Sequence, residues 1–186
     1  MDPGLVERAR GGDLGAFEAL ASASHARLYR VAFGILRDSD RAKDAAQNAL
    51  VDIWKHLQGL RDPGAYESWS NRVVVRACMR EVRQRPRFLP HPLEEVGLEP
   101  RTAGAIAMVL DRDQLERGFR RLSVEHRAVI VMRYLLDQSY DDIAAVLEVS
   151  PGTVGSRLNR AMAALRAALE ADERPALPVL EPQEID

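Results

Sequence analysis

The feature that most constrains the fold is a pair of long helical periodicities separated by a proline-rich interruption. From residue 39 to 60, apolar side chains recur at steps of one, three and four, which places them on one face of an α-helix. Helical periodicity returns after residue 104 and continues to about residue 171. Between the two stretches, four prolines interrupt residues 86–103, and proline both lacks a backbone donor and disfavours helix before it. The pattern predicts an all-α chain of two small helical domains joined by a flexible linker.

These interruptions also set the domain boundaries. We expect a first domain at 1–85, a linker at 86–103, a second domain at 104–171, and a disordered acidic tail with three prolines at 172–186. Within the first domain, long helices are predicted at about 13–36, 39–60 and 66–85. A turn is predicted at 61–64, because Pro63 and Gly64 favour a reversal of the chain. No alternation of period two is long enough to indicate a sheet.

The net charge of −2 hides a strongly uneven distribution. Residues 72–87 contain six arginines and one glutamate, and residues 150–169 contain three arginines and no acid, whereas residues 170–186 contain six acids and one arginine. Two basic segments are therefore compatible with nucleic-acid binding despite the acidic total. The single cysteine, Cys78, excludes an internal disulfide and suits a reducing compartment. With no secretory signal or membrane-spanning apolar run evident, we expect a cytoplasmic protein without membrane attachment.

The second half contains a pattern typical of a helix-turn-helix. A helix is predicted at 139–147 and a second one from residue 151, where Ser150 can cap the helix and Pro151 occupies the first turn. If Glu148 in the turn is left-handed, it carries a penalty that glycine avoids. Ile143, Ala144, Leu147, Val154 and Leu158 are expected to form the joint between the helices. The side chains expected on the outer face of the second helix are Thr153, Ser156, Arg157, Asn159 and Arg160.

Such an outer face can read DNA. A recognition helix lies in the major groove, where arginine can bind guanine and asparagine can bind adenine. Serine, threonine and the helix N-terminus suit phosphates. The pattern alone also fits two packed helices with a solvated basic face.

Two polar helix faces stand out in the first half. Residues four apart share one face of a helix, so Asp40, Asp44, Asn48 and Asp52 form an acidic stripe opposite the apolar face. Arg72, Arg76, Arg80 and Arg83 likewise form a basic ridge that can follow a phosphate backbone. Tyr66 and Trp69 begin the same helix, and aromatic rings beside arginines can stack on unpaired bases. The alternative for Trp69, which we prefer, is a place in the core.

Taken together, these segments resemble the extracytoplasmic-function (ECF) sigma factors of RNA polymerase. The similarity rests on residues 44–54, 69–74, 122–129 and 152–161, in that order, and covers about residues 5–171. The family consists of two helical domains, regions two and four, joined by a linker. Several positions depart from its usual pattern. Asn48 stands where an acid is common, Arg76 where asparagine is frequent, and Gly155 where a basic residue is frequent. Ser70 and Asn71 replace a more apolar pair, and Glu148 fills a turn position often given to glycine.

The resemblance implies a binding role for each surface. Residues implied to dock on the β′ clamp helices of core RNA polymerase are Asp40, Asp44, Gln47, Asn48 and Asp52. Residues implied to bind the downstream, minus-ten promoter element are Tyr66, Trp69, Asn71, Arg72, Arg76 and Arg80. Residues implied to bind the upstream, minus-thirty-five element are Thr153, Gly155, Ser156, Arg157, Asn159 and Arg160. The β flap of the polymerase and an anti-sigma factor are further partners that the family makes plausible.

Catalysis is not indicated. The four histidines are scattered, with no metal-ligand spacing, and no glycine-rich phosphate loop is present, so we expect neither a metal nor a cofactor and no enzymatic activity. We therefore predict an ECF-type sigma factor that directs promoter-specific transcription initiation. Two alternatives remain: a free-standing helix-turn-helix regulator of duplex DNA, and a sigma-like decoy that only sequesters a partner.

Overall fold

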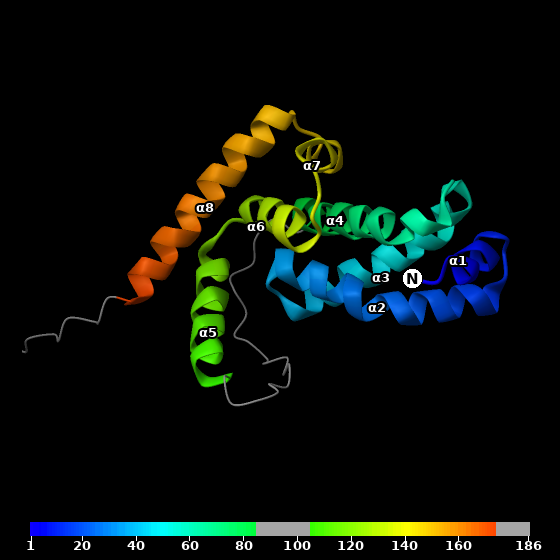
Figure 1. Cartoon of the computed structure of the whole chain (residues 1–186), viewed down its shortest axis with the longest axis horizontal. Coiled ribbons are helices and arrows are strands. Elements are labelled where there is room, and N and C mark those ends of the chain that lie inside the picture. The colour runs from blue at the N-terminus through cyan, green and yellow to red at the C-terminus, as the bar shows by residue number, and fades with distance from the viewer. Residues whose placement is uncertain (85–104, 174–186) are drawn as a thin grey trace, which may run out of the picture.

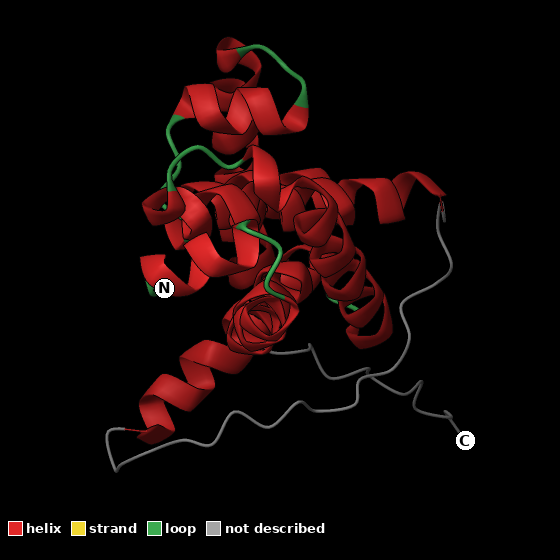
Figure 2. Ribbon diagram, turned by 90° about the vertical axis from the view of Figure 1, so that its right-hand side faces the viewer, coloured by secondary structure: helices red, strands yellow, loops and turns green. Residues whose placement is uncertain are grey.

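Every regular element in the part of the chain that the structure describes is helical. The structure is a computed structural model that describes residues 1–84 and 105–173, and both views show helices joined by short loops in these ranges (Figures 1 and 2). This confirms the predicted all-α architecture of two small domains. The predicted linker at 86–103 and the tail from residue 174 onward lie outside the described residues. The last helix ends at Glu173, two residues beyond the predicted end.

The first domain is a bundle in which three long helices pack against one another. Its elements are α1 (Pro3–Arg10), α2 (Leu14–Leu36), α3 (Ser39–His56), the 3₁₀ turns η1 (Leu57–Gly59) and η2 (Pro63–Ala65), and α4 (Tyr66–Gln84). The side chains of Asp2, Asp13 and Asp38 each accept a hydrogen bond from a free backbone N–H in the first turn of α1, α2 and α3. These caps fix where the helices begin, because the first four N–H groups of a helix have no partner within it.

The contact between α2 and α3 depends on small side chains. Four alanines of α3 are fully buried, and Ile53 and Leu57 continue the same face toward the turn. Alanine allows two helix backbones to approach closely, which brings α3 against both α2 and α4. The predicted apolar face is confirmed, although the α-helix stops at His56 and η1 completes it as a 3₁₀ turn. The buried alanines are Ala42, Ala45, Ala46 and Ala49.

The second domain contains the predicted helix-turn-helix. Its elements are α5 (Ala105–Arg121), α6 (Val124–Ile130), the π-helical turn η3 (Val131–Leu135), α7 (Tyr140–Leu147) and α8 (Pro151–Glu173). The Ser150 hydroxyl accepts a hydrogen bond from the backbone N–H of Thr153 at 3.1 Å, so the predicted cap of α8 is confirmed. Ile143, Ala144, Val154 and Leu158 are buried as predicted, and Leu147 is half-buried.

The two domains are in contact with each other. Helix α6 and the turn η3 pack against α2, and α7 packs against α4 (Figure 1). Gly34 of α2 lies at this contact. A Cβ added to Gly34 would lie only 3.3 Å from Cγ2 of Val131 in η3. Glycine at this position therefore permits the close approach of the second domain to α2.

The turn of the helix-turn-helix contains a strained residue. Glu148 ends α7 in the left-handed conformation, with φ 56° and ψ 46°, and its N–H bonds to the Ala144 carbonyl. A Cβ in this conformation crowds the neighbouring carbonyl oxygen, and glycine avoids that clash. The penalty anticipated from the sequence for a left-handed Glu148 is therefore present.

Replacing this residue with glycine should stabilise the second domain. We expect Glu148→Gly to raise the free energy of unfolding by about 1 kcal/mol, because the left-handed strain is removed. Urea denaturation followed by circular dichroism measures the change. Glu148→Ala serves as the matched control, since it removes the same side chain but keeps the strain and should gain nothing. A loss of stability in Glu148→Gly would contradict the strain argument.

Candidate nucleic-acid and partner interfaces

The four arginines of α4 form a continuous basic surface, which we call the α4 ridge (Arg72, Arg76, Arg80 and Arg83). The side of α4 that faces the core carries Val74, Val75 and Cys78, all fully buried. The arginines at steps of four, four and three are thereby turned outward: Arg72 is partly exposed and the other three are exposed. This arrangement presents positive charge along about three helical turns, which suits a phosphate backbone.

The acidic side of α3 points away from the core, as predicted. Asp40, Gln47 and Asn48 are exposed, whereas Asp44 and Asp52 are half-buried. We call Asp40, Asp44, Asn48 and Asp52 the α3 stripe. At its C-terminal end the stripe meets the α4 ridge, because Asp52 forms an ion pair with Arg80.

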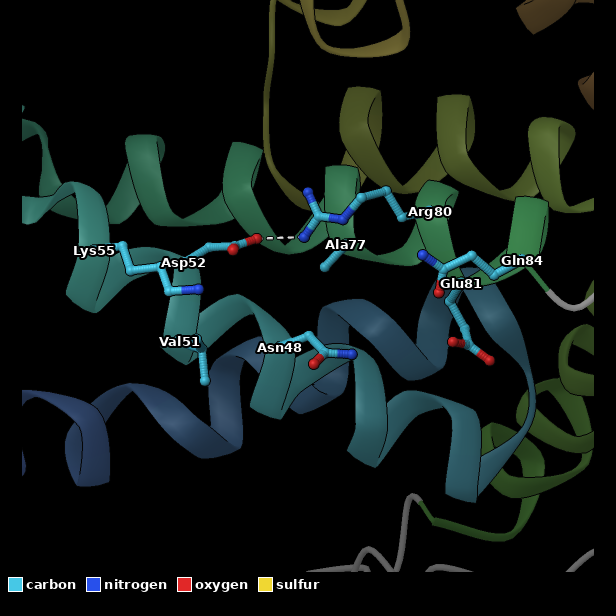
Figure 3. A pocket seen from close by; sticks show the side chains of 8 residues that line it. All are labelled: Asn48, Val51, Asp52, Lys55, Ala77, Arg80, Glu81 and Gln84. Carbon is cyan, nitrogen blue, oxygen red and sulfur yellow. Dashed lines mark hydrogen bonds and ion pairs between the residues drawn. The ribbon is translucent and has the colours of Figure 1, made fainter.

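A small polar pocket lies at this junction between α3 and α4 (Figure 3). Its volume is about 230 Å³, and the Asp52–Arg80 ion pair lies within its wall. The lining mixes acids, bases and amides, so it has no single charge to select a ligand. The lining residues are Asn48, Val51, Asp52, Lys55, Ala77, Arg80, Glu81 and Gln84.

Apolar side chains beside the stripe were missed by the sequence reasoning. Trp54 is 43% exposed and Val51 is 50% exposed, although both belong to α3. The Trp54 ring packs on Phe17 of α2, with ring centroids 4.6 Å apart. An exposed tryptophan next to charged residues is typical of a protein-binding surface. The sequence could have revealed their exposure, because neither residue lies on the predicted apolar face of α3.

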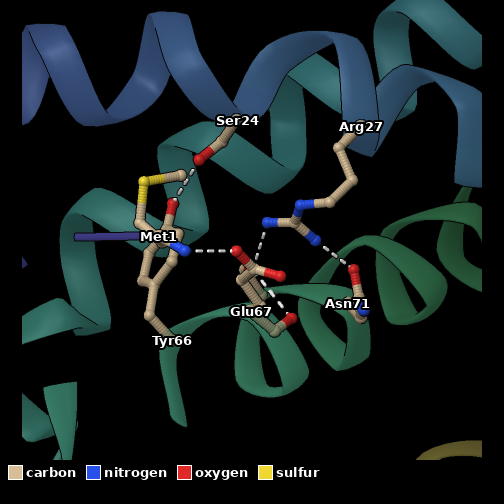
Figure 4. A network of polar contacts seen from close by, with 7 residues as sticks. Met1, Ser24, Arg27, Tyr66, Glu67 and Asn71 are labelled. Atoms are coloured by element: carbon tan, nitrogen blue, oxygen red, sulfur yellow. Dashed lines mark hydrogen bonds and ion pairs between the residues drawn. The ribbon is translucent and has the colours of Figure 1, made fainter. Parts of the chain in front are cut away.

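The start of α4 is held to α2 by a polar network (Figure 4). Tyr66 is fully buried, and its hydroxyl lies 2.9 Å from the Ser24 hydroxyl. Burial raises the pKa of the Tyr66 phenol above its ordinary value. Arg27 donates hydrogen bonds to the side chains of Asn71 and, at 2.8 Å, Ser70. Several α2 contacts therefore fix the position of the α4 N-terminus.

This network separates the six residues predicted for the downstream element into two groups. Arg72, Arg76 and Arg80 lie on the outward ridge. Trp69 is half-buried against the core, as preferred from its spacing, with its ring 6.2 Å from that of Tyr66. Tyr66 lies inside the core, and Asn71 accepts a hydrogen bond from Arg27. In this conformation, Tyr66 orients the start of α4 and does not itself reach the surface.

The second helix of the helix-turn-helix presents a row of polar side chains. Ser156, Asn159 and Arg160 are exposed, and we call them the outer row of α8. Thr153 and Arg157 flank it and are half-buried. The hydroxyl of Thr153 lies 2.8 Å from that of Ser150 in the helix cap.

Gly155 differs from the other residues predicted for this face. A Cβ at this position would lie 3.6 Å from the Tyr140 ring of α7. Gly155 therefore lies on the side of α8 that faces the preceding helix.

The described residues show no arrangement typical of a metal centre. Within 1–84 and 105–173, no group of three histidine, cysteine or acidic side chains is placed to hold a metal ion. Cys78 is buried, which raises the pKa of its thiol to about 12 and leaves it protonated at neutral pH. In the same ranges, no helix combines the length and apolarity needed to cross a bilayer.

Two helical domains, one with a helix-turn-helix and the other with a basic ridge beside an acidic stripe, define the chain as a protein of the sigma factor class. Family models for Sigma-70 region 2 and Sigma-70 region 4 match residues 20–88 and 112–165. The ECF RNA polymerase sigma factor SigM of Mycobacterium tuberculosis is 36% identical over 85% of this chain and 79% of the relative. SigL from the same species is 30% identical over 89% of this chain and 95% of the relative. The chain therefore belongs to the ECF family of RNA polymerase sigma factors.

Solved structures share the same fold. CnrH in complex with the cytosolic domain of CnrY is 28% identical, with a TM-score of 0.56, and the match covers 92% of this chain and 98% of that chain. The sigma factor RpoE in complex with the anti-sigma factor NepR, from Bartonella quintana, has a TM-score of 0.58 over 84% of this chain. At 23% identity, the second match supports the fold alone.

The hydrogen bond of the buried Tyr66 hydroxyl should make a measurable contribution to the stability of the first domain. Tyr66→Phe keeps the ring but removes the hydrogen bond to Ser24, so we expect the free energy of unfolding to fall by about 1 kcal/mol. Adding Ser24→Ala to that variant should cost much less than Ser24→Ala alone, because the shared bond is already lost. Urea denaturation of the four proteins completes the cycle. Additive losses would contradict the buried contact.

Proposed function

We propose that this chain binds core RNA polymerase through the first domain and directs it to promoters through both domains. The observation that carries the proposal is the combination on one chain of the α3 stripe, the adjoining α4 ridge and the outer row of α8. They occur in two domains that match sigma regions 2 and 4 in the family's order. A free-standing helix-turn-helix regulator would leave the α3 and α4 surfaces without a function.

The α3 helix is proposed as the docking surface for the β′ clamp helices of the polymerase. Asp40, Asp44, Gln47, Asn48 and Asp52 would supply the polar and acidic contacts. The exposed Trp54 and Val51 would add an apolar centre, and a tryptophan surrounded by polar groups commonly dominates binding energy. The acidic charge would mainly speed the encounter and fix the orientation.

The α4 helix is proposed as the downstream promoter surface. Arg72, Arg76 and Arg80 would follow the phosphates of the opened strand, and Asn71 and Trp69 adjoin them at the start of the helix. Tyr66 would contribute by holding that start in place from the core. Each phosphate that an arginine neutralises makes binding more sensitive to salt, so this surface should bind weakly at high ionic strength.

The α8 helix is proposed as the upstream promoter surface. Asn159 and Arg160 of the outer row can reach base edges in the major groove, and Ser156, Thr153 and Arg157 can reach bases or phosphates. Gly155, which faces Tyr140 of α7, would add no side-chain contact to DNA. Each element can be bound weakly, because the polymerase holds both domains near the same DNA at high effective concentration.

Further partners follow from the same assignment. The second domain would contact the β flap of the polymerase, and an anti-sigma factor is a proposed regulator, since solved neighbours contain such proteins or a bound cytosolic domain. The chain would act in the cytoplasm, where transcription takes place, and would need no cofactor of its own. Sigma factors as a class are not enzymes, so we expect no catalytic activity.

Comigration with core RNA polymerase from the same organism tests the proposal. On gel filtration, the unaltered chain should elute with the core enzyme, whereas Asp44→Arg and Trp54→Ala should each weaken the association about tenfold or more, about 1.4 kcal/mol. Glu170→Arg is the matched control, because it reverses an exposed acid on α8, outside the docking surface, and should comigrate normally.

Two results would contradict this proposal. Failure of the folded, unaltered chain to join core polymerase would favour the free-standing regulator. Comigration without any promoter-specific transcript would favour the sigma-like decoy.

A further inference from the structure

One charged side chain of α2 binds two consecutive residues of α4. The Arg27 guanidinium donates hydrogen bonds to the side-chain oxygen of Asn71 and, at 2.8 Å, to the hydroxyl of Ser70. Ser70 is fully buried, and its hydroxyl donates in turn to the Glu67 carbonyl at 3.1 Å. Arg27 therefore fixes the side chains of two neighbouring residues near the start of the α4 ridge.

This contact decides which way the Asn71 amide faces. A guanidinium carries donors and no acceptor, so the amide atom that faces Arg27 must be the oxygen. Figure 4 shows the Asn71 oxygen turned toward Arg27 and the nitrogen turned away. Within 1–84 and 105–173 the nitrogen has no hydrogen-bond partner, yet it is not enclosed, because the buried groups without a partner there are Arg37 Nε and Gln138 Oε1. Asn71 thus presents hydrogen-bond donors to solvent.

The position of Asn71 places these donors beside the proposed path of the DNA. Asn71 directly precedes Arg72, the first residue of the α4 ridge, and Ser68, one turn earlier, is exposed. A strand whose phosphates follow the ridge carries its bases past the start of the helix. Unpaired bases expose the hydrogen-bonding edges that a duplex hides, so a side-chain amide at this place can bond to one of them.

The orientation of the amide restricts which base it can bond to. Asparagine commonly binds adenine through both amide atoms, the oxygen accepting from the exocyclic amino group. In this chain the Asn71 oxygen is turned toward Arg27, which removes that mode. The remaining amide N–H groups match a keto oxygen, which thymine and guanine carry where cytosine and adenine carry an amino group.

We propose that Asn71 recognises a keto base, thymine or guanine, in the opened downstream element, and that Arg27 is the positioning residue that holds the amide in its donating orientation. The inference rests on the proposed promoter function of α4. Ser70 and Asn71 stand where a more apolar pair is usual in the family, and such a pair could not accept hydrogen bonds from Arg27. The contact therefore makes recognition at this position a property of this particular chain.

The base preference of transcription tests the proposal. Core RNA polymerase from the same organism would be saturated with the full chain and given a promoter that the chain uses. The bases of its downstream element would be randomised, and each promoter would be linked to a barcode within the transcribed region. Sequencing the transcripts gives the preference at every position. For the unaltered chain we expect one position at which keto bases are favoured over amino bases by about threefold or more.

Two variants change the amide in different ways. Asn71→Asp has the same shape and still accepts from Arg27, but it has no donor, so the preference at that position should shift by about threefold or more toward cytosine or adenine. Arg27→Met keeps a long side chain without donors and frees the amide to turn. It should reduce the preference at the same position to about twofold or less.

Two further variants serve as matched controls. Ser68→Asp adds a negative charge at an exposed position one turn before Asn71, so it should weaken transcription from all promoters without altering the base preference. Ser70→Ala removes the other hydrogen bond of Arg27 but leaves its contact with Asn71, and the preference should persist. Circular dichroism and comigration with core polymerase establish that each variant is folded and bound.

Each outcome decides the proposal. If the unaltered chain yields no transcript from any promoter, both the proposed function and this inference are refuted. If Asn71→Asp yields fewer transcripts with the same base preference, Asn71 does not recognise a base, and this inference alone is refuted. Unchanged preference in a folded Arg27→Met would refute the part given to Arg27. Should that variant not fold, Asn71→Asp still tests the donor, because it keeps the contact with Arg27.

Discussion

The arrangement of the two domains depends most on the hydrogen bonds that the last carbonyl groups of α2 accept. The carbonyls of Ile35 and Leu36 accept hydrogen bonds from Arg127, which lies about 90 residues further along the chain. Because this guanidinium is buried between the domains, its bonds position α6, and through α6 they position the helix-turn-helix against α4. Gly34, one turn earlier than Arg37, leaves the space that this approach requires. The hydrogen bonds at one helix end thus help to set the relative position of two surfaces that are proposed to bind DNA.

Helix α4 shows how one element can serve several purposes. Its inner side carries Val74, Val75 and Cys78 into the core, its N-terminus is held by Tyr66, and its outer side forms the α4 ridge. The neighbouring α3 uses small buried alanines to approach both α2 and α4 while its polar side stays exposed. Core packing therefore fixes the spacing between the proposed polymerase surface and the proposed promoter surface, and the Asp52–Arg80 ion pair joins them.

The sequence predicted the helices better than it predicted the contacts between residues far apart in the chain. Periodicity and capping residues identified α2, α3, α4 and the helix-turn-helix, because those signals act over a few residues. Tyr66 was considered for the surface but is buried, since its partner Ser24 lies 42 residues away and no local pattern reveals that pairing. The burial of Arg127 could not be predicted from the sequence, because a charged residue in a helix is usually exposed to solvent. The exposure of Trp54 likewise depends on which face of α3 is covered by α2.

The central claim is that the first domain uses two separate surfaces, the α3 stripe for polymerase and the α4 ridge for the promoter. The most direct measurement is the amount of transcript that core RNA polymerase saturated with Arg76→Ala makes from a promoter that the unaltered chain uses. Arg76 is exposed on the ridge and lies outside the proposed docking surface. The account predicts normal comigration with core polymerase and a transcript reduced about fivefold or more, because a phosphate contact is lost. A normal transcript from Arg76→Ala would contradict it.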